Sequence, residues 1–324
     1  MIDFRYHLVS IAAIFLSLAI GIVLGATALS DPSLTFLKSQ TSDLAKENQA
    51  YRNQVQQMQR RQEGENQFAQ RLGPQLVQGQ LSAERVVFVV LPGASQTIHD
   101  QATKMVAQAG ATVSGQVTVQ KKFLDDDQIT VLDQLAQTVK PSDITFPQNA
   151  TPYDKAAAVL AGAVVTDQQA RAGSEDASGG EILSGFKDQG FVTFSGKPGG
   201  RATLAVVIAP STPYQGQGSE TDNQALVSIA AALDAADQGT VLAGPYQAAQ
   251  DGGLIQVLRN SGAAERVSTV DTADTPSGQV VTVLALAAER TGTSGKYGTG
   301  SGAEGYLPGP STSPTVEPTG KGRS

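Results

Sequence analysis

The feature that most constrains this chain is an uninterrupted apolar run near its start. Residues 8–29 read LVSIAAIFLSLAIGIVLGATAL and contain no Asp, Glu, Lys, Arg, Asn or Gln. As a helix, a run of this length spans about 33 Å, which matches a hydrocarbon core of roughly 30 Å. The run therefore predicts a transmembrane helix over residues 8–29.

The residues beside this run predict its orientation. Arg5 precedes it and Asp31 follows it. Because positive charge favours the cytoplasmic side, we expect residues 1–7 in the cytoplasm and the bulk outside, with a single pass through the cell membrane. A cleaved signal peptide is the alternative, since residues 26–28 (ATA) resemble a cleavage site. The run exceeds the apolar length of about 7–15 residues usual in signal peptides, which favours a retained anchor.

Small side chains recur every four residues inside the run. They are Ala13, Ser17, Gly21 and Gly25, and this spacing puts them on one helix face. In lipid, helices associate through close backbone approach, which small residues permit. The pattern predicts a self-association face, although Gly and Ser are also common in membrane helices in general.

The segment 30–73 follows with a heptad pattern. Position d falls on Leu37, Leu44, Tyr51 and Met58, and position a on Thr41, Asn48 and Val55. The pattern weakens at Gln62 and Glu65, although by register it continues at Ala69 and Leu72. It predicts a coiled coil in a parallel homodimer or small homo-oligomer, with Asn48 fixing the register. A lone amphipathic helix packed on the globular domain is the alternative. Gly73-Pro74 is expected to end the helix.

Strands and helices then alternate from residue 81 to residue 290. Strands are expected at 85–92, 111–119, 190–196, 201–211 and 240–245, and helices at 95–110, 125–139, 151–165, 221–239 and 252–262; residues 266–271 and 277–289 complete the order. This alternation predicts a three-layer α/β domain of the Rossmann or flavodoxin-like kind, with a mostly parallel sheet.

In such folds ligands bind beyond the carboxyl ends of the strands. The loops 92–95, 210–219 and 244–246 are therefore the candidate binding loops. The last stretch, 291–324, is rich in Gly, Ser, Thr and Pro and is expected to be disordered.

The sequence offers little for catalysis. Its two histidines are His7, at the membrane edge, and His99, on an expected helix, so a nucleophile has no evident base. The loop LPGASQT opens a helix, but it matches neither phosphate-binding glycine motif, and Ser95 reads better as a helix cap. We expect no enzymatic activity and no catalytic residues.

Metal and nucleic-acid binding find equally little support. Residues 125–127 (DDD) could attract a hard cation, yet acids at a helix start usually favour the helix dipole. Cysteine is absent and Met1, Met58 and Met105 form no cluster, so no copper-binding residues can be assigned. The net charge of −7, without a basic block, argues against nucleic acid as a partner.

Three segments resemble a known family. They are MIDFRYHLVSIAAIFLSLAIGIVLGA, then DPSLTFLKSQTSDLAKENQAYR, and VSTVDTADTPSGQVVTVLALA with GKYGTG. Together they resemble the actinobacterial MctB family of copper transporters, over most of residues 1–300. The resemblance implies an envelope protein in copper efflux or homeostasis, with copper as a transported ion rather than a tightly bound cofactor. One member is assigned to the outer membrane as a channel, which is the alternative location.

The same family includes SteB-like proteins, which are similar to this chain to an equal degree. They imply a different role, that of a dimeric coiled-coil scaffold bound to a cell-wall or cell-division protein in the envelope. No family copper-ligand motif matches residues of this sequence, so the two roles remain open at this point.

Overall fold

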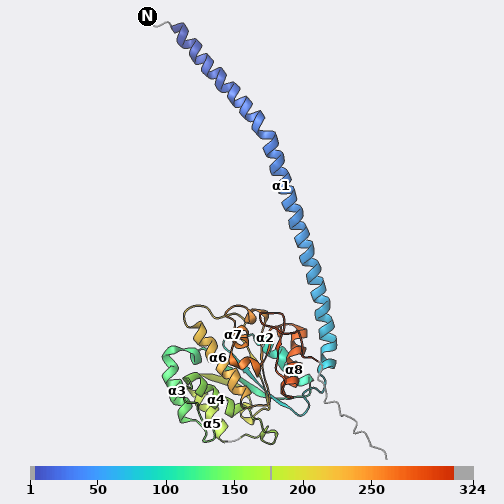
Figure 1. The fold of residues 1–324 in the computed structure, drawn as a ribbon, viewed down its shortest axis with the longest axis vertical. Helices are drawn as coiled ribbons and strands as arrows, with labels where there is room; N and C mark the ends of the chain where they lie inside the picture. The colour runs from blue at the N-terminus through green and yellow to red at the C-terminus, as the bar shows by residue number, and fades with distance from the viewer. Residues whose placement is uncertain (1–3, 176, 310–324) are drawn as a thin grey trace, which may run out of the picture. The chain divides into compact units, whose positions relative to one another are not determined.

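A computed structural model describes residues 4–175 and 177–309, apart from the side chains of residues 28–34 and 37. The chain divides into two compact units, residues 1–65 and residues 66–324. The first unit holds most of helix α1, and the second is an α/β unit that begins with the last turns of the same helix (Figure 1).

Helix α1 runs from Phe4 to Val77, which is 74 residues. It joins the apolar run and the heptad segment in one helix, and its backbone stays helical through Asp31 and Pro32. The expected stop at Gly73-Pro74 is wrong, because the helix continues past both residues.

The continuation has a packing cause. A Cβ built on Gly73 would lie 2.8 Å from Cγ2 of Val280, so the glycine lets the helix approach helix α8 (Pro276–Glu289) closely. Val77 and Leu81, just beyond, are fully buried. Burial of two large side chains is worth about 1.5–3 kcal/mol each, comparable to the roughly 3 kcal/mol that an interior proline costs. The sequence pattern indicates a helix end at Gly73, whereas in the structure this glycine is the point of close contact between α1 and α8.

A seven-stranded sheet forms the centre of the α/β unit. Its order is β3-β2-β1-β4-β5-β6-β7, and every neighbouring pair is parallel except β2 and β3, which are antiparallel. The strands are β1 (Arg85–Val90), β2 (Thr112–Val119), β3 (Val192–Gly196), β4 (Leu204–Ile208), β5 (Thr240–Ala243), β6 (Ser268–Val270) and β7 (Lys296–Tyr297). The prediction of a mostly parallel sheet is confirmed.

Helices cover both faces of this sheet. The remaining helices are α2 (Gln96–Gln108), α3 (Ile129–Thr138), α4 (Pro152–Val164), α5 (Ala177–Asp188), α6 (Ser219–Asp234) and α7 (Leu254–Arg259). Helices α3 to α7 share one buried core with Val87 and Val89 of β1, whereas α2, α8 and Val77 share the other with Val86 and Phe88. Alternate residues of the same strand thus face opposite cores, as a doubly covered sheet requires.

Three local details differ from the expectations. Residues 126–128 form a 3-10 turn, and helix α3 begins only at Ile129. Helix α5 was not predicted, because its sequence ASGGEILSGFKD holds three glycines, which are poor helix formers. The expected disordered tail begins too early at residue 291, since β7 lies within it and Tyr297 is buried. Residues 310–324 of that tail lie outside the described residues.

Candidate functional site

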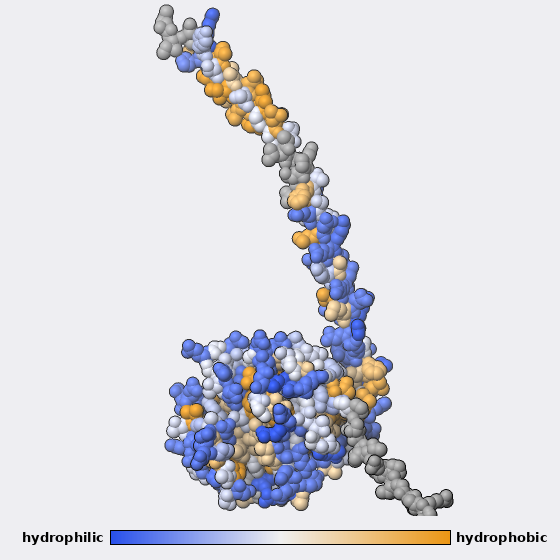
Figure 2. All heavy atoms as spheres, viewed as in Figure 1, coloured by the Kyte–Doolittle hydropathy of each residue, from blue (hydrophilic) through white to orange (hydrophobic). Residues whose placement is uncertain are grey.

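The first part of α1 suits a membrane span by length and composition. Residues Phe4–Thr27 form a helical stretch long and apolar enough to cross a membrane, and their side chains are exposed in the single chain. Hydrophobic side chains cover these turns of the helix in Figure 2, and mostly hydrophilic ones follow along the next turns. An exposed apolar helix of this kind is stable only when a membrane or another apolar surface covers it.

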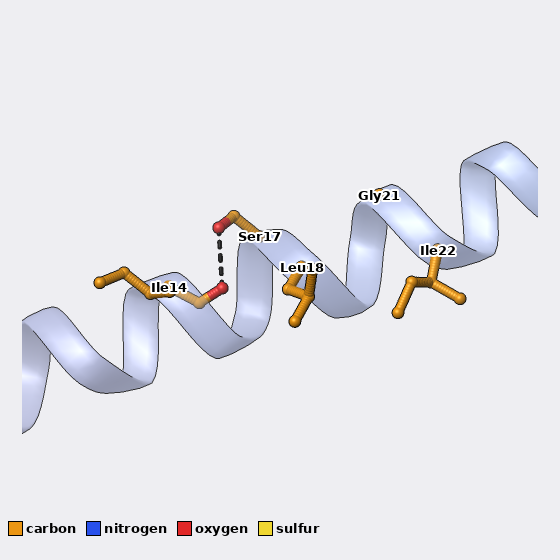
Figure 3. Close-up of a pocket in the computed structure, with 5 residues that line it drawn as sticks. All are labelled: Ile14, Ser17, Leu18, Gly21 and Ile22. Carbon is orange, nitrogen blue, oxygen red and sulfur yellow. Dashed lines mark hydrogen bonds between the residues drawn. The ribbon is translucent and has the colours of Figure 1, made fainter.

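A hollow lies on this helix where two of the predicted small residues are. Figure 3 shows Ser17 and Gly21 along one edge, with the larger side chains of Ile14, Leu18 and Ile22 beside them. These five residues line a shallow space of about 370 Å³. A Cβ built on Gly21 or Gly25 would meet nothing within 4 Å. This surface of the helix is therefore open in the single chain.

The hydroxyl of Ser17 is compatible with an apolar setting. Its Oγ donates to the carbonyl oxygen of Ile14 over 2.9 Å, within the helix (Figure 3). The polar group is satisfied without a partner from outside, so Ser17 acts here as a small residue. Ala13 is likewise exposed on the helix surface.

The predicted seam residues are exposed along α1. Leu44, Tyr51, Val55 and Met58 each expose between 52% and 68% of their surface. Thr41 and Asn48 are exposed as well, while the side chain of Leu37 lies outside the described residues. Apolar side chains at regular heptad spacing are thus uncovered in a single chain, which is the condition that a coiled coil would relieve.

Two of the candidate loops in the α/β unit are tied to each other. The hydroxyl of Tyr214 donates to the carbonyl oxygen of Pro92 over 2.6 Å, and the backbone N–H of Ser211 donates to the carbonyl oxygen of Gly93 over 3.0 Å. These loops follow β4 and β1, which are adjacent in the sheet. The contacts lie beside the strand ends, where α/β folds commonly bind ligands.

The polar residues His99 and Ser95, considered above as candidates for chemistry, have structural roles in the fold. His99 is buried, stacks edge-on against Phe88 at 5.2 Å between ring centroids, and interacts with Asp100 at 3.0 Å. Ser95 is the N-cap residue of α2, but its side chain makes no capping bond. Each residue is accounted for by packing or by its position at a helix end.

Among the described residues, the sulfur and carboxylate groups form no evident metal centre. Met58 is exposed on α1, whereas Met105, a residue of α2, is buried in the core. In the part of the chain that the structure describes, no group of three or more His, Cys, Asp or Glu residues is placed to hold a metal ion. Met1 is outside that part.

Sequence reasoning missed a buried ion pair at the end of the sheet. Nη1 of Arg259 lies 2.8 Å from Oδ2 of Asp271, and the two side chains are 1% and 0% exposed. Arg259 also donates to Thr269, Tyr297 and Ser301, and Asp271 accepts from the amides of Thr299 and Gly300. Pairing this complete is what lets two charges remain buried.

This ion pair explains the segment GKYGTG in structural terms. A Cβ on Gly298, whose φ is +131°, would meet Oδ1 of Asp271, so only glycine fits there. The segment thus folds over the ion pair and adds β7 beside β6. It stabilises this end of the sheet, and a lone Arg and Asp in the sequence gave no signal of this pairing.

Two further buried carboxyl groups, those of Glu289 and Asp237, lie near the amino ends of β5 and β6. Burial raises the pKa of Glu289 to about 7, although its carboxylate accepts from the amide of Ser268 over 2.7 Å. Burial also raises the pKa of Asp237, which accepts from Thr240 and Gly239. These carboxyls are bound to the backbone of the fold and make its stability depend on pH.

Comparison with known proteins points in one direction. The model of a family described as "Copper transport outer membrane protein, MctB" matches residues 1–308. Proteins named copper transporter MctB from Mycobacterium tuberculosis, Mycobacterium bovis and Mycobacterium leprae are each 30% identical to this chain over 312 residues. The alignments cover 94% of this chain and 98% of each relative.

Proposed function

This chain belongs to the MctB family of copper transport proteins, and from that membership we propose that it is a membrane-anchored envelope protein in copper efflux and homeostasis. The observation that carries the proposal is the family match over residues 1–308, which spans both the apolar helix and the α/β unit. Relatives named copper transporters align over almost their whole length, so the likeness is not confined to the anchor.

The proposed topology is a single pass through the cell membrane. Residues 1–7 would lie in the cytoplasm and the α/β unit outside, which the position of Arg5 before the apolar helix supports. The outer membrane is the alternative location, because the family description names it. Fractionation of the two membranes with an antibody against the α/β unit distinguishes them.

Assembly is the second part of the proposal. The small-residue face at Ser17 and Gly21 and the heptad residues from Thr41 to Met58 would pair two chains in parallel, as a coiled coil anchored in lipid. The exposure of Leu44 and Val55 in the single chain supports this. The α/β unit is assigned to the flavodoxin-like class, supported by its parallel strands in the order β2-β1-β4-β5-β6.

Copper enters the proposal as cargo. Cu(I) prefers sulfur and imidazole ligands, and the sequence has no cysteine, three methionines and two histidines. Transient handling of the ion, without tight binding and without enzymatic chemistry, is consistent with that composition.

Deletion of the gene in its host tests the proposal. The strain should accumulate copper, measured by mass spectrometry of washed cells, and should stop growing at lower copper concentrations. The full chain should reverse both effects. Unchanged copper content and copper tolerance in the deletion strain would overturn the copper role.

A scaffold for a cell-wall or cell-division protein is the second candidate. The packing of His99 against Phe88 and the 3-10 turn at residues 126–128 favour it, because both are structural roles and a scaffold requires no reactive site. Purification of the full chain from crosslinked cells should then recover such a protein, and the deletion strain should show a division or cell-wall defect with normal copper content.

A further inference from the structure

An uncovered apolar face lies on the last turns of α1, inside the α/β unit. Phe68 and Leu76 expose 65% and 57% of their surface, and Leu72 between them is partly exposed. The spacing of four residues puts all three on one side of the helix. Another side of the same turns is occupied, because Gly73 and Val77 pack into the core with α2 and α8.

The heptad register connects this face to the proposed coiled coil. Steps of seven from Leu44 reach Leu72 at position d, and steps of seven from Asn48 reach Leu76 at position a. Phe68 is a g residue, which flanks the seam. After the polar positions Gln62 and Glu65, the apolar seam therefore resumes in the same register.

Charge on the flanking positions identifies the occupant. Glu47 is a g residue and Arg52, five residues later, is an e residue. In a parallel, in-register coiled coil, each g residue faces the e residue of the following heptad in the other chain. Glu47 of one copy would thus meet Arg52 of the other, twice by symmetry. Opposite charges at this pair fit a second copy of this chain in parallel orientation.

We propose that Phe68, Leu72 and Leu76 contact the same three residues of a second copy, so that the two α/β units are paired at the end of the coiled coil. The inference rests on the proposed parallel dimer and adds a separate contact to it. Its chemistry is apolar packing of six large side chains, reached after an intervening polar stretch of the seam.

The absence of cysteine from the sequence makes the test direct. Two test variants each carry a single cysteine at an a position of the heptad, Leu76→Cys and Val55→Cys. Their matched controls, Arg71→Cys and Gln57→Cys, carry it at an exposed c position. Each variant is the full chain in mild detergent. A disulfide needs Cα atoms within about 7 Å, which a positions reach and c positions do not. The readout is the fraction of disulfide-linked dimer after brief mild oxidation.

We expect Leu76→Cys and Val55→Cys each to crosslink at least about tenfold faster than their controls. If Val55→Cys crosslinks but Leu76→Cys reacts no faster than Arg71→Cys, the inference is overturned and the dimer stands. If neither a-position variant exceeds its control, the proposed dimer and the inference both fail. Circular dichroism melting of each variant shows that the substituted chain is folded.

Discussion

Arg259 and Asp271 form an ion pair 2.8 Å long between side chains that are almost wholly buried. The pair joins helix α7 to the end of β6, and amides of the following Gly-rich loop complete its hydrogen bonds. A buried pair adds little net stability over apolar residues, but removal of one partner leaves an uncompensated charge.

Arg259→Met should therefore destabilise the α/β unit strongly. We expect a loss of about 3–5 kcal/mol in the free energy of unfolding, because the carboxyl group of Asp271 would stay buried without its cationic partner. Urea unfolding followed by circular dichroism measures the change. Lys296→Met is the control, because it breaks the more exposed pair with Glu304 on the same segment and should have a much smaller effect. Equal losses in both variants would contradict the role assigned to burial.

Glu289 predicts a pH dependence of a particular sign. Burial raises the pKa of its carboxyl from 4.5 to about 7 in the folded protein. Between these pH values the folded chain keeps a proton that the unfolded chain has lost, so this residue lowers the stability as the pH rises. Glu289→Gln removes the effect and can still accept from Ser268. The variant should gain up to about 3 kcal/mol over the parent above pH 7 and nothing below pH 4.5.

Melting temperatures of parent and variant across pH 4 to 8 test this sign. Glu304→Gln, on a largely exposed side chain, is the control, and its melting temperature should follow the same dependence on pH as that of the parent. A constant offset between Glu289→Gln and the parent over the whole range would show that the carboxyl titrates alike in both states.

Gly73 predicts a difference between two glycines in the same helix. Gly73→Val places side-chain atoms against Val280 and should cost about 1–3 kcal/mol of unfolding free energy in the α/β unit. Gly64 has nothing within 4 Å of a built Cβ, so Gly64→Val should leave the unfolding of that unit unchanged. Thermal melts of both full-length variants make the comparison, and similar midpoints would refute the close-packing account.

The sequence predicted the elements whose burial follows a simple period. Strand β1 reads RVVFVV and is buried on both faces, and helix α4 is preceded by its N-cap residue Thr151, whose capping box with Asp154 is encoded locally. Helix α5 was missed because its glycines lower helix propensity, and its formation depends on Ile182 and Phe186 reaching the core. Local patterns cannot report contacts of that range.

The candidate site also contains some features that the sequence predicts and others that only the fold reveals. The small-residue face and the seam are repeats of four and seven, so they could be read from residue numbers alone. The packing of Gly73 against Val280 and the pairing of Arg259 with Asp271 join residues that are distant in the chain or separated by a turn, and only the fold brings them together. Leu76 was missed because the expected helix end at Gly73-Pro74 preceded it.

The hollow beside Gly21 predicts how the membrane helices associate. Gly21→Ile with Gly25→Ile fills a surface that is open in the single chain, and should weaken self-association by about tenfold or more. The reason is that close helix approach in lipid relies on dispersion contacts and loses them when branched side chains intervene. Energy transfer between labelled full-length chains in lipid vesicles, over a range of dilutions, measures the dissociation constant.

The matched control uses the opposite face of the same helix. Ala12→Ile with Ala19→Ile adds comparable bulk about 180° away around the helix, and like the Gly→Ile pair it makes the helix more apolar, so both double variants should insert into the bilayer. We expect association of this variant to equal that of the parent. If both double variants weaken association alike, helix bulk in general is responsible, and the face defined by Ser17 and Gly21 has no special part in pairing.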